Sequence, residues 1–231
     1  MTDLRFETYD WKGGCEAMLR FGPAAPAAPA DSDPIVVAAL PLFEEANRTR
    51  QFMVTILRAL AAAGIASVLP DLPGTGDSIV VTHASRLADQ RDAYGDLIRQ
   101  LGARCYALAI RGGALVDVGA PVAGRWHFAP QSGGEVVREL DRMRATARTE
   151  RTDDGNYAGN TLSATMLADI RDASLHRGGA QRTVRLDTDP RVADAKYPGS
   201  PLWRRAEPGN DILLAQKLAA DISQWTASCE H

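Results

Sequence analysis

The chain has 231 residues, of which 45% are hydrophobic and 24% are charged, and its net charge at neutral pH is −3. This composition is ordinary for a globular protein with one substantial core, so we expect a single domain over residues 1–231. The basic residues form no run long enough for a nucleic-acid footprint, no apolar stretch is as long as a membrane span, and the first residues lack the order of a signal peptide. We therefore expect no nucleic-acid partner, no membrane span and a cytoplasmic location.

Cysteine, histidine and glycine spacing gives no sign of a metal or a nucleotide. Cys15, Cys105 and Cys229 are too far apart for paired zinc ligands or a disulfide framework, so we expect three reduced thiols. No two histidines lie at the spacing of metal ligands. The Gly74-Thr-Gly76 segment is too short for a dinucleotide fingerprint. The sequence therefore predicts neither a metal site nor a cofactor.

The first part of the chain predicts a hairpin followed by a buried strand. Leu4 to Tyr9 and Glu16 to Phe21 alternate in character around Gly13-Gly14, which is typical of an antiparallel hairpin at a sheet edge. The proline- and alanine-rich residues 23–29 favour an extended connection. Residues 35–40 form a continuous apolar run, as expected in a strand that is covered on both faces.

Strands and helices then alternate, which predicts a parallel sheet with helices on both faces. Phe52, Ile56 and Leu60 recur at helical spacing within residues 49–63, and a second helix is expected over 85–101. The expected strands of this part cover residues 66–70 and 105–110. Ligands of such sheets bind beyond the carboxyl ends of the strands.

The second half continues the alternation of strands and helices. The expected elements are a strand at 125–130, a helix with Val136, Leu140, Met143 and Ala147 on one side, a polar loop at 148–155, a helix at 162–170, a last strand at 182–187, and a terminal helix with Leu214, Leu218, Ile222 and Trp225 on one stripe.

The segment from Cys105 to Ala114 predicts a strand that passes through a tight turn into a helix over Gly112–Val118. Small residues stand two positions before and two positions after the centre of the turn, as Ala109 and Gly113. This is the pattern of the nucleophile elbow of α/β-hydrolases, G-x-S-x-G. Its centre here is Arg111, which stays protonated at working pH and cannot attack a carbonyl.

The acid and histidine positions of the triad also argue against a serine-hydrolase mechanism. In α/β-hydrolases the acid follows the nucleophile, and the histidine comes after the last strand. Asp187 and Asp189 stand where the acid would lie, but no histidine occurs from residue 177 to residue 230, and His231 at the chain end is a poor general base. We expect an acid in this position to pair with Arg111 instead. The remaining histidines are expected to be structural: His83, His127 and His176.

Several motifs resemble one bacterial family. They are Pro41-Leu-Phe-Glu-Glu-Ala-Asn-Arg-Thr-Arg50, Leu69-Pro-Asp-Leu-Pro-Gly-Thr-Gly-Asp-Ser78, Ile110-Arg-Gly-Gly-Ala-Leu115, Ala158-Gly-Asn-Thr-Leu162, and Pro201-Leu-Trp203 with Glu207-Pro208. Together they resemble the exosortase A system-associated hydrolases, and the elbow resembles the second type of that family, in which arginine commonly replaces the serine. The resemblance spans roughly residues 35 to 225. It implies an α/β-hydrolase fold, a small helical lid at about 133–175, and a role in PEP-CTERM sorting or exopolysaccharide systems.

Three functions are compatible with these residues. The first is a pseudoenzyme that binds an anionic small molecule or a lipid-linked intermediate, because the elbow would place Arg111 at the N-terminus of the 112–118 helix, where backbone N–H groups favour an anion. The ligand-binding residues expected for it are Arg111, Gly112, Leu42, Phe43, Glu44, Asn47 and Arg50.

The second function is an active esterase or thioesterase with a relocated nucleophile, for which the candidates are Ser78, Ser132 and Ser163. Its oxyanion-hole donor would lie in the turn at residues 40–43. The third is a non-catalytic interaction module that binds a protein partner or a second copy of the chain. In that case a polar network would join Glu44, Glu45, Asn47 and Arg50.

Overall fold

The structure is a computed structural model that describes residues 3–22, 34–146, 155–157 and 159–230. The chain begins with the antiparallel hairpin of β1 (Asp3–Trp11) and β2 (Gly14–Gly22), in which Trp11 pairs with Gly14 across the turn. The predicted hairpin is confirmed, and β2 continues the pairing on its other side by running antiparallel to β4 (Ala66–Pro70).

The hairpin forms one edge of an eight-stranded sheet in the order β1-β2-β4-β3-β5-β6-β9-β10. From β4 onward all neighbouring strands are parallel. The remaining strands are β3 (Ile35–Ala39), β5 (Cys105–Ile110), β6 (Gly124–Phe128), β9 (Ala180–Leu186) and β10 (Ala195–Tyr197). The sequence pattern ended the sheet at β9, so the short strand β10 is an addition to the predicted architecture.

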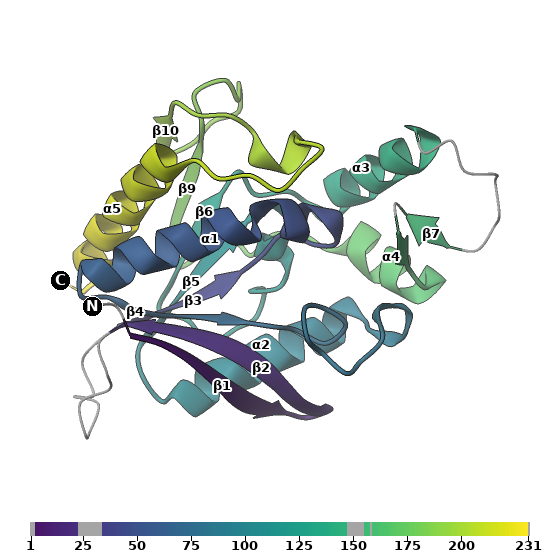
Figure 1. Ribbon diagram of the computed structural model, residues 1–231, viewed down its shortest axis with the longest axis horizontal. Coiled ribbons are helices and arrows are strands. Elements are labelled where there is room, and N and C mark those ends of the chain that lie inside the picture. The colour runs from purple at the N-terminus through teal and green to yellow at the C-terminus, as the bar shows by residue number, and fades with distance from the viewer. Residues whose placement is uncertain (1–2, 23–33, 147–154, 158, 231) are drawn as a thin grey trace.

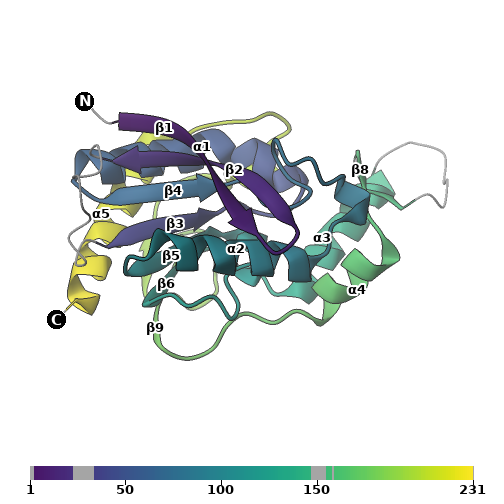
Figure 2. The ribbon, with the colours of Figure 1, turned by 90° about the horizontal axis from the view of Figure 1, so that it is seen from below.

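Helices cover both faces of the sheet, as the alternation predicted (Figures 1 and 2). On one face, Val36 and Ala38 of β3 share a core with α1 (Glu44–Ala62) and α5 (Ile212–Cys229). On the other face, Val37 and Ala39 share a core with α2 (Leu87–Leu101). Successive residues of a strand point to opposite faces, so a strand that is apolar throughout fits a sheet buried on both sides.

The segments between β6 and β9 lie at the end of the sheet where the parallel strands finish (Figures 1 and 2). They comprise α3 (Gly133–Thr146), the two-stranded pair β7 (Asn156–Tyr157) and β8 (Asn160–Thr161), and α4 (Ala164–Asp172). This is the region expected to form a lid. Ala147, most of the polar loop 148–155, the stretch 23–29 and His231 lie outside the described residues.

Two predicted elements differ clearly from the observed ones, whereas other boundaries shift by only one or two residues. The helix α1 begins at Glu44, five residues before the predicted start, because its first turn carries polar residues that the apolar spacing did not reveal. The predicted helix over Gly112–Val118 is instead a five-residue 3₁₀ helix, η2 (Arg111–Leu115). Two further 3₁₀ turns are η1 (Thr82–Ala84) and η3 (Leu202–Arg204). Within the described ranges, no helix is long and apolar enough to cross a membrane.

Candidate functional site

The turn after β5 has the backbone geometry of a strained elbow. Arg111 has φ 56°, and it shares this left-handed conformation with Phe43 after β3 and Ala129 after β6. These are the non-glycine residues of the described chain with positive φ, and such strain concentrates at functional sites. A Cβ on Gly113 would lie 2.4 Å from the carbonyl oxygen of Leu40, so the strand and the turn can approach only because residue 113 is glycine.

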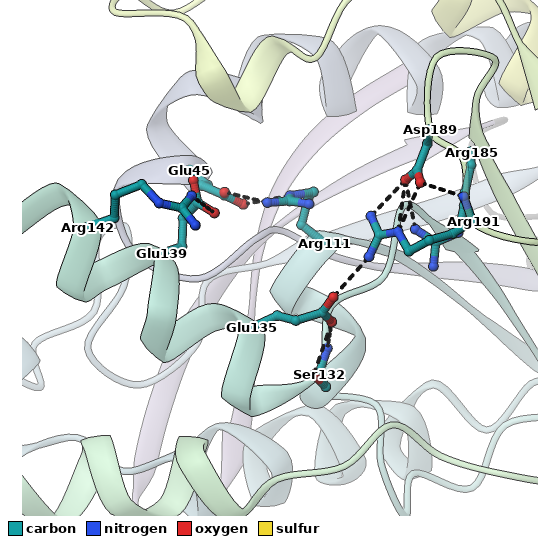
Figure 3. Close-up of polar contacts among 9 residues, drawn as sticks. All are labelled: Glu45, Arg111, Ser132, Glu135, Glu139, Arg142, Arg185, Asp189 and Arg191. Carbon is teal, nitrogen blue, oxygen red and sulfur yellow. Dashed lines mark hydrogen bonds and ion pairs between the residues drawn. The ribbon is translucent and has the colours of Figure 1, made fainter.

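Arg111 is neutralised by a buried carboxylate from the start of α1. Its Nε donates to Glu45 Oε2 at 3.1 Å and its Nη2 donates to Glu45 Oε1 at 3.0 Å (Figure 3). The two side chains are only 5% and 10% exposed. Such a bidentate pair satisfies both charges where water cannot. The predicted pairing of Arg111 with Asp187 or Asp189 is therefore wrong, because Glu45 is the carboxylate that accepts the hydrogen bonds of the guanidinium.

Asp189, in the β9–β10 loop, instead binds two other arginines: Arg185 at the end of β9 and Arg191 in the same loop. Arg185 Nη1 donates to its carboxylate at 3.0 Å and Arg191 Nη2 at 2.7 Å (Figure 3). The hydrogen bonds from Arg191 are the main cause that lowers the pKa of Asp189 well below its ordinary value. Asp187 is exposed, and its backbone N–H donates to the carbonyl of Tyr197. Neither candidate acid makes a hydrogen bond or an ion pair with Arg111, whose carboxylate partner is Glu45.

A tryptophan contacts the elbow from the loop after the last strand, where a triad would place its histidine. The Cζ atom of Arg111 lies 4.7 Å from the centre of the Trp203 ring, a cation–π contact. Trp203 stands in η3, after β10, and Phe128 packs edge-on against its ring. The Pro201-Leu-Trp203 motif was visible in the sequence, but its position against Arg111 was not predicted.

None of the described histidines is placed to act as the general base of the elbow. His127 Nε2 lies 2.6 Å from Asp117 Oδ2 within a buried cluster that also includes Arg125. His83 belongs to η1, and His176 is half-buried ahead of β9. None of the three lines the cavity beside Arg111. The elbow therefore has neither a nucleophile nor a general base within the part of the chain that the structure describes.

The three candidate serines make hydrogen bonds that stabilise local structure. Ser78 Oγ donates to Glu16 and accepts from the backbone N–H groups of Gly74 and Val80. Ser163 caps α4 by accepting from the backbone N–H of Met166. Ser132, the residue before α3, donates from both its backbone N–H and its hydroxyl to Glu135. No histidine is among these hydrogen-bond partners, so none of the three serines has the base that would activate it.

A cavity of about 500 Å³ opens beside the elbow, between α3, the β9–β10 loop and η3. A cavity of this size suits a small-molecule ligand. Its charged lining residues are five arginines, namely Arg111, Arg138, Arg142, Arg191 and Arg204, and three carboxylates, namely Glu135, Glu139 and Asp189. The lining therefore has an excess of positive charge, although the whole chain is acidic. Leu186 and Trp203 add an apolar wall.

Of the ligand-binding residues expected from the sequence, Arg111 lines this cavity. Leu42, Phe43 and Gly112 line a separate, mostly apolar space of about 10 Å³, which is at most large enough for one water molecule. The polar residues at the start of α1 do not form the single network expected from the sequence, because they bind separate partners. Asn47 Nδ2 donates to Glu44 at 3.3 Å, Arg50 pairs with Asp71 at 3.1 Å, and Glu45 turns inward to Arg111. The 3₁₀ helix after the elbow is too short to supply the helix dipole on which the predicted anion site depended.

No protein-family model and no curated protein sequence matches the chain. Among solved structures, the chain is similar to Est1E from Butyrivibrio proteoclasticus, solved with bound ferulic acid, with a TM-score of 0.65, 12% identity, and coverage of 94% of this chain and 98% of that chain. A putative hydrolase from Agrobacterium vitis S4 gives a TM-score of 0.61 at 13% identity and covers 97% of this chain and 99% of its own. A lidless α/β serine hydrolase from Xanthomonas campestris gives 0.59 at 12% identity, with 98% and 94% covered. Together with the mostly parallel sheet and its antiparallel hairpin, these likenesses establish that the chain adopts the α/β-hydrolase fold.

Proposed function

We propose that this protein binds an anionic small molecule in the cavity beside Arg111 and does not hydrolyse it by serine chemistry. The observation that carries the proposal is the composition of the cavity wall, in which arginines outnumber carboxylates five to three and two of the arginines, Arg138 and Arg204, have no described carboxylate in contact. Guanidinium groups form paired hydrogen bonds with phosphate and carboxylate oxygens, so such a lining selects anions over neutral molecules.

The elbow itself argues against catalysis. A buried arginine paired with Glu45 stands at the nucleophile position, and Trp203 stands where a histidine would serve as base. Covalent acyl transfer needs a nucleophile that can lose its proton to a neighbouring base, and an arginine–glutamate pair supplies neither function. The site is built for binding.

The resemblance to exosortase A system-associated hydrolases of the second type supports a more specific role. In that setting the protein acts in the cytoplasm on a substrate or lipid-linked intermediate of an exopolysaccharide or protein-sorting system, with residues 133–175 as the lid of one domain. Phosphate groups of lipid-linked sugars are anions of the kind that the cavity favours.

A thermal-shift screen tests the proposal. Purified protein is melted with small carboxylates, phosphates and sulfonates, each paired with its uncharged amide or alcohol as control. A bound anion at about ten times its Kd adds about 1.4 kcal/mol of stability and raises the melting temperature by about 3 °C. The proposal fails if neutral partners shift the melting temperature as much as the anions do, or if no anion shifts it.

A further inference from the structure

Most charges at the cavity are already balanced by a partner within the protein. Arg111 pairs with Glu45, and Arg142 Nη1 lies 3.2 Å from Glu139. Arg191 is shared between Asp189 and Glu135, both within 3.0 Å (Figure 3). Arg185, behind the wall, also pairs with Asp189. A guanidinium that is already engaged in this way has little charge left to attract a ligand.

Two arginines of the lining differ from the rest. The side chains of Arg138 on α3 and Arg204 in η3 are exposed, and neither makes a hydrogen bond or an ion pair with any residue that the structure describes. They come from two different elements and line the same cavity. The cavity thus carries two guanidinium groups that no described carboxylate contacts, although the charge of Arg138 acts on Glu135 through space and lowers its pKa.

A third side chain at the cavity makes no hydrogen bond to a described residue. Gln131 is only 5% exposed and lines the cavity, yet its side-chain amide has no hydrogen-bond partner among the described residues. The amide atoms themselves are not enclosed by protein, so they are available to hydrogen-bond a ligand in the cavity. Its N–H₂ can donate to a ligand oxygen.

From these three side chains we infer that the ligand of the cavity is a phosphate monoester, held as a dianion by Arg138 and Arg204 and hydrogen-bonded by Gln131. This inference rests on the proposed anion-binding function and adds the ligand class and the residues that select it. A phosphate monoester carries close to two negative charges at neutral pH and offers three acceptor oxygens. Its charge matches the two unpaired arginines, and the apolar wall of Leu186 and Trp203 accommodates the organic part of the ester.

The arginines of the cavity, Glu135 and Asp189 keep their charges across the pH range in which the ligand titrates. Arginine does not lose its proton. Burial by itself raises the pKa of Glu135, but hydrogen bonds from Ser132 and the charges of Arg191 and Arg138 outweigh it and hold the pKa below its ordinary value. The pKa of Asp189 is also lowered, chiefly by Arg191, and Glu139 is the remaining carboxylate of the lining. The second pKa of a phosphate monoester lies near 6, so the ligand itself changes charge near that pH, and phenyl sulfate reports any change that the protein contributes.

The test is calorimetric titration of the whole protein with phenyl phosphate and with phenyl sulfate, which has the same shape but a single charge. At pH 7.5 we expect phenyl phosphate to bind about tenfold more tightly, since one further charge-assisted hydrogen bond contributes at least that factor. Lowering the pH through about 6 should weaken phenyl phosphate and leave phenyl sulfate unchanged.

Three variants locate the site. Arg138→Gln and Arg204→Gln should each weaken phenyl phosphate about tenfold and reduce its preference over phenyl sulfate. Arg58→Gln is the matched control, because Arg58 is also exposed and without an ion pair but does not line the cavity. Its affinity should equal that of the parent protein.

The outcomes separate the two proposals. If phenyl sulfate binds as tightly as phenyl phosphate, the dianion is wrong and anion binding stands. If both probes bind but Arg138→Gln and Arg204→Gln leave the affinity unchanged, the assigned residues are wrong. If neither these probes nor any other small anion binds, the proposed function fails and the inference fails with it.

Discussion

Arg111 and Glu45 form the ion pair on which the elbow depends. Both side chains are almost fully buried, and Trp203 covers the guanidinium. Removing one partner of such a pair leaves an uncompensated charge in a medium of low dielectric, which is more costly than removing both. The pair is therefore a structural requirement of this elbow as well as the reason that it lacks a nucleophile.

Arg111→Met should lower the free energy of unfolding by about 3–5 kcal/mol, because Glu45 then remains buried without a partner. The double variant Arg111→Met with Glu45→Gln should recover part of this loss, since no buried charge is left over. Urea unfolding measures both values, with Arg58→Met as a surface control that changes stability by less than about 0.5 kcal/mol. A double variant as unstable as Arg111→Met alone would show that packing, and not charge, holds the elbow.

The sequence predicted the elbow but not the partner of its arginine. Ala109, Arg111 and Gly113 have a spacing that defines the turn locally, so the pattern alone was sufficient. The choice between Glu45 and Asp187 depends on how α1 and the β9–β10 loop pack, and no local pattern carries that information. The positions of Trp203 and Gln131 at the cavity were not predicted for the same reason, because they depend on segments that are far apart in the chain.

At the scale of elements, Asp221 of α5 joins the helix to three segments at one side of the sheet. Its carboxylate accepts from Trp126 on β6, from Arg182 on β9 and from Tyr197 on β10, at 2.7 to 2.9 Å. Burial by itself raises the pKa of Asp221, but hydrogen bonds from Arg182, Trp126 and Tyr197 outweigh burial and lower the pKa below its ordinary value. These bonds anchor β10, the strand that sequence periodicity missed because it is only three residues long.

Asp221→Asn should lower the free energy of unfolding by about 3 kcal/mol at pH 7, because hydrogen bonds to an ionised group are replaced by weaker neutral ones. The folded-state pKa is below the unfolded-state pKa of about 3.9, so the carboxylate stabilises the fold above about pH 4 and this contribution is lost as the pH falls further. The gap between parent and variant should stay constant from pH 5 to 8 and shrink below pH 4. Asp92→Asn, an exposed residue on α2, is the control, and a gap that persists at pH 2.5 would contradict the assigned role.

At the scale of the whole molecule, the alternation of strands and helices determined the fold class. The apolar runs of β3 and β5 and the helical spacing on α1 and α2 are local signals, and chain connectivity then leaves few topologies. The region around α3 and α4 was placed correctly as helices, but the cavity that it borders was not predicted. Cavities depend on the side chains of several elements at once, and here they are α3, the β9–β10 loop and η3.

The most direct test of the account is to incubate the purified protein with a fluorophosphonate and map the adducts by mass spectrometry, with a serine hydrolase labelled in parallel. Fluorophosphonates react with serines that a neighbouring base activates. We predict no specific adduct, because Arg111 stands at the elbow and Ser78, Ser132 and Ser163 serve structural roles. Stoichiometric labelling of a single serine would contradict the account and identify the nucleophile of an active hydrolase.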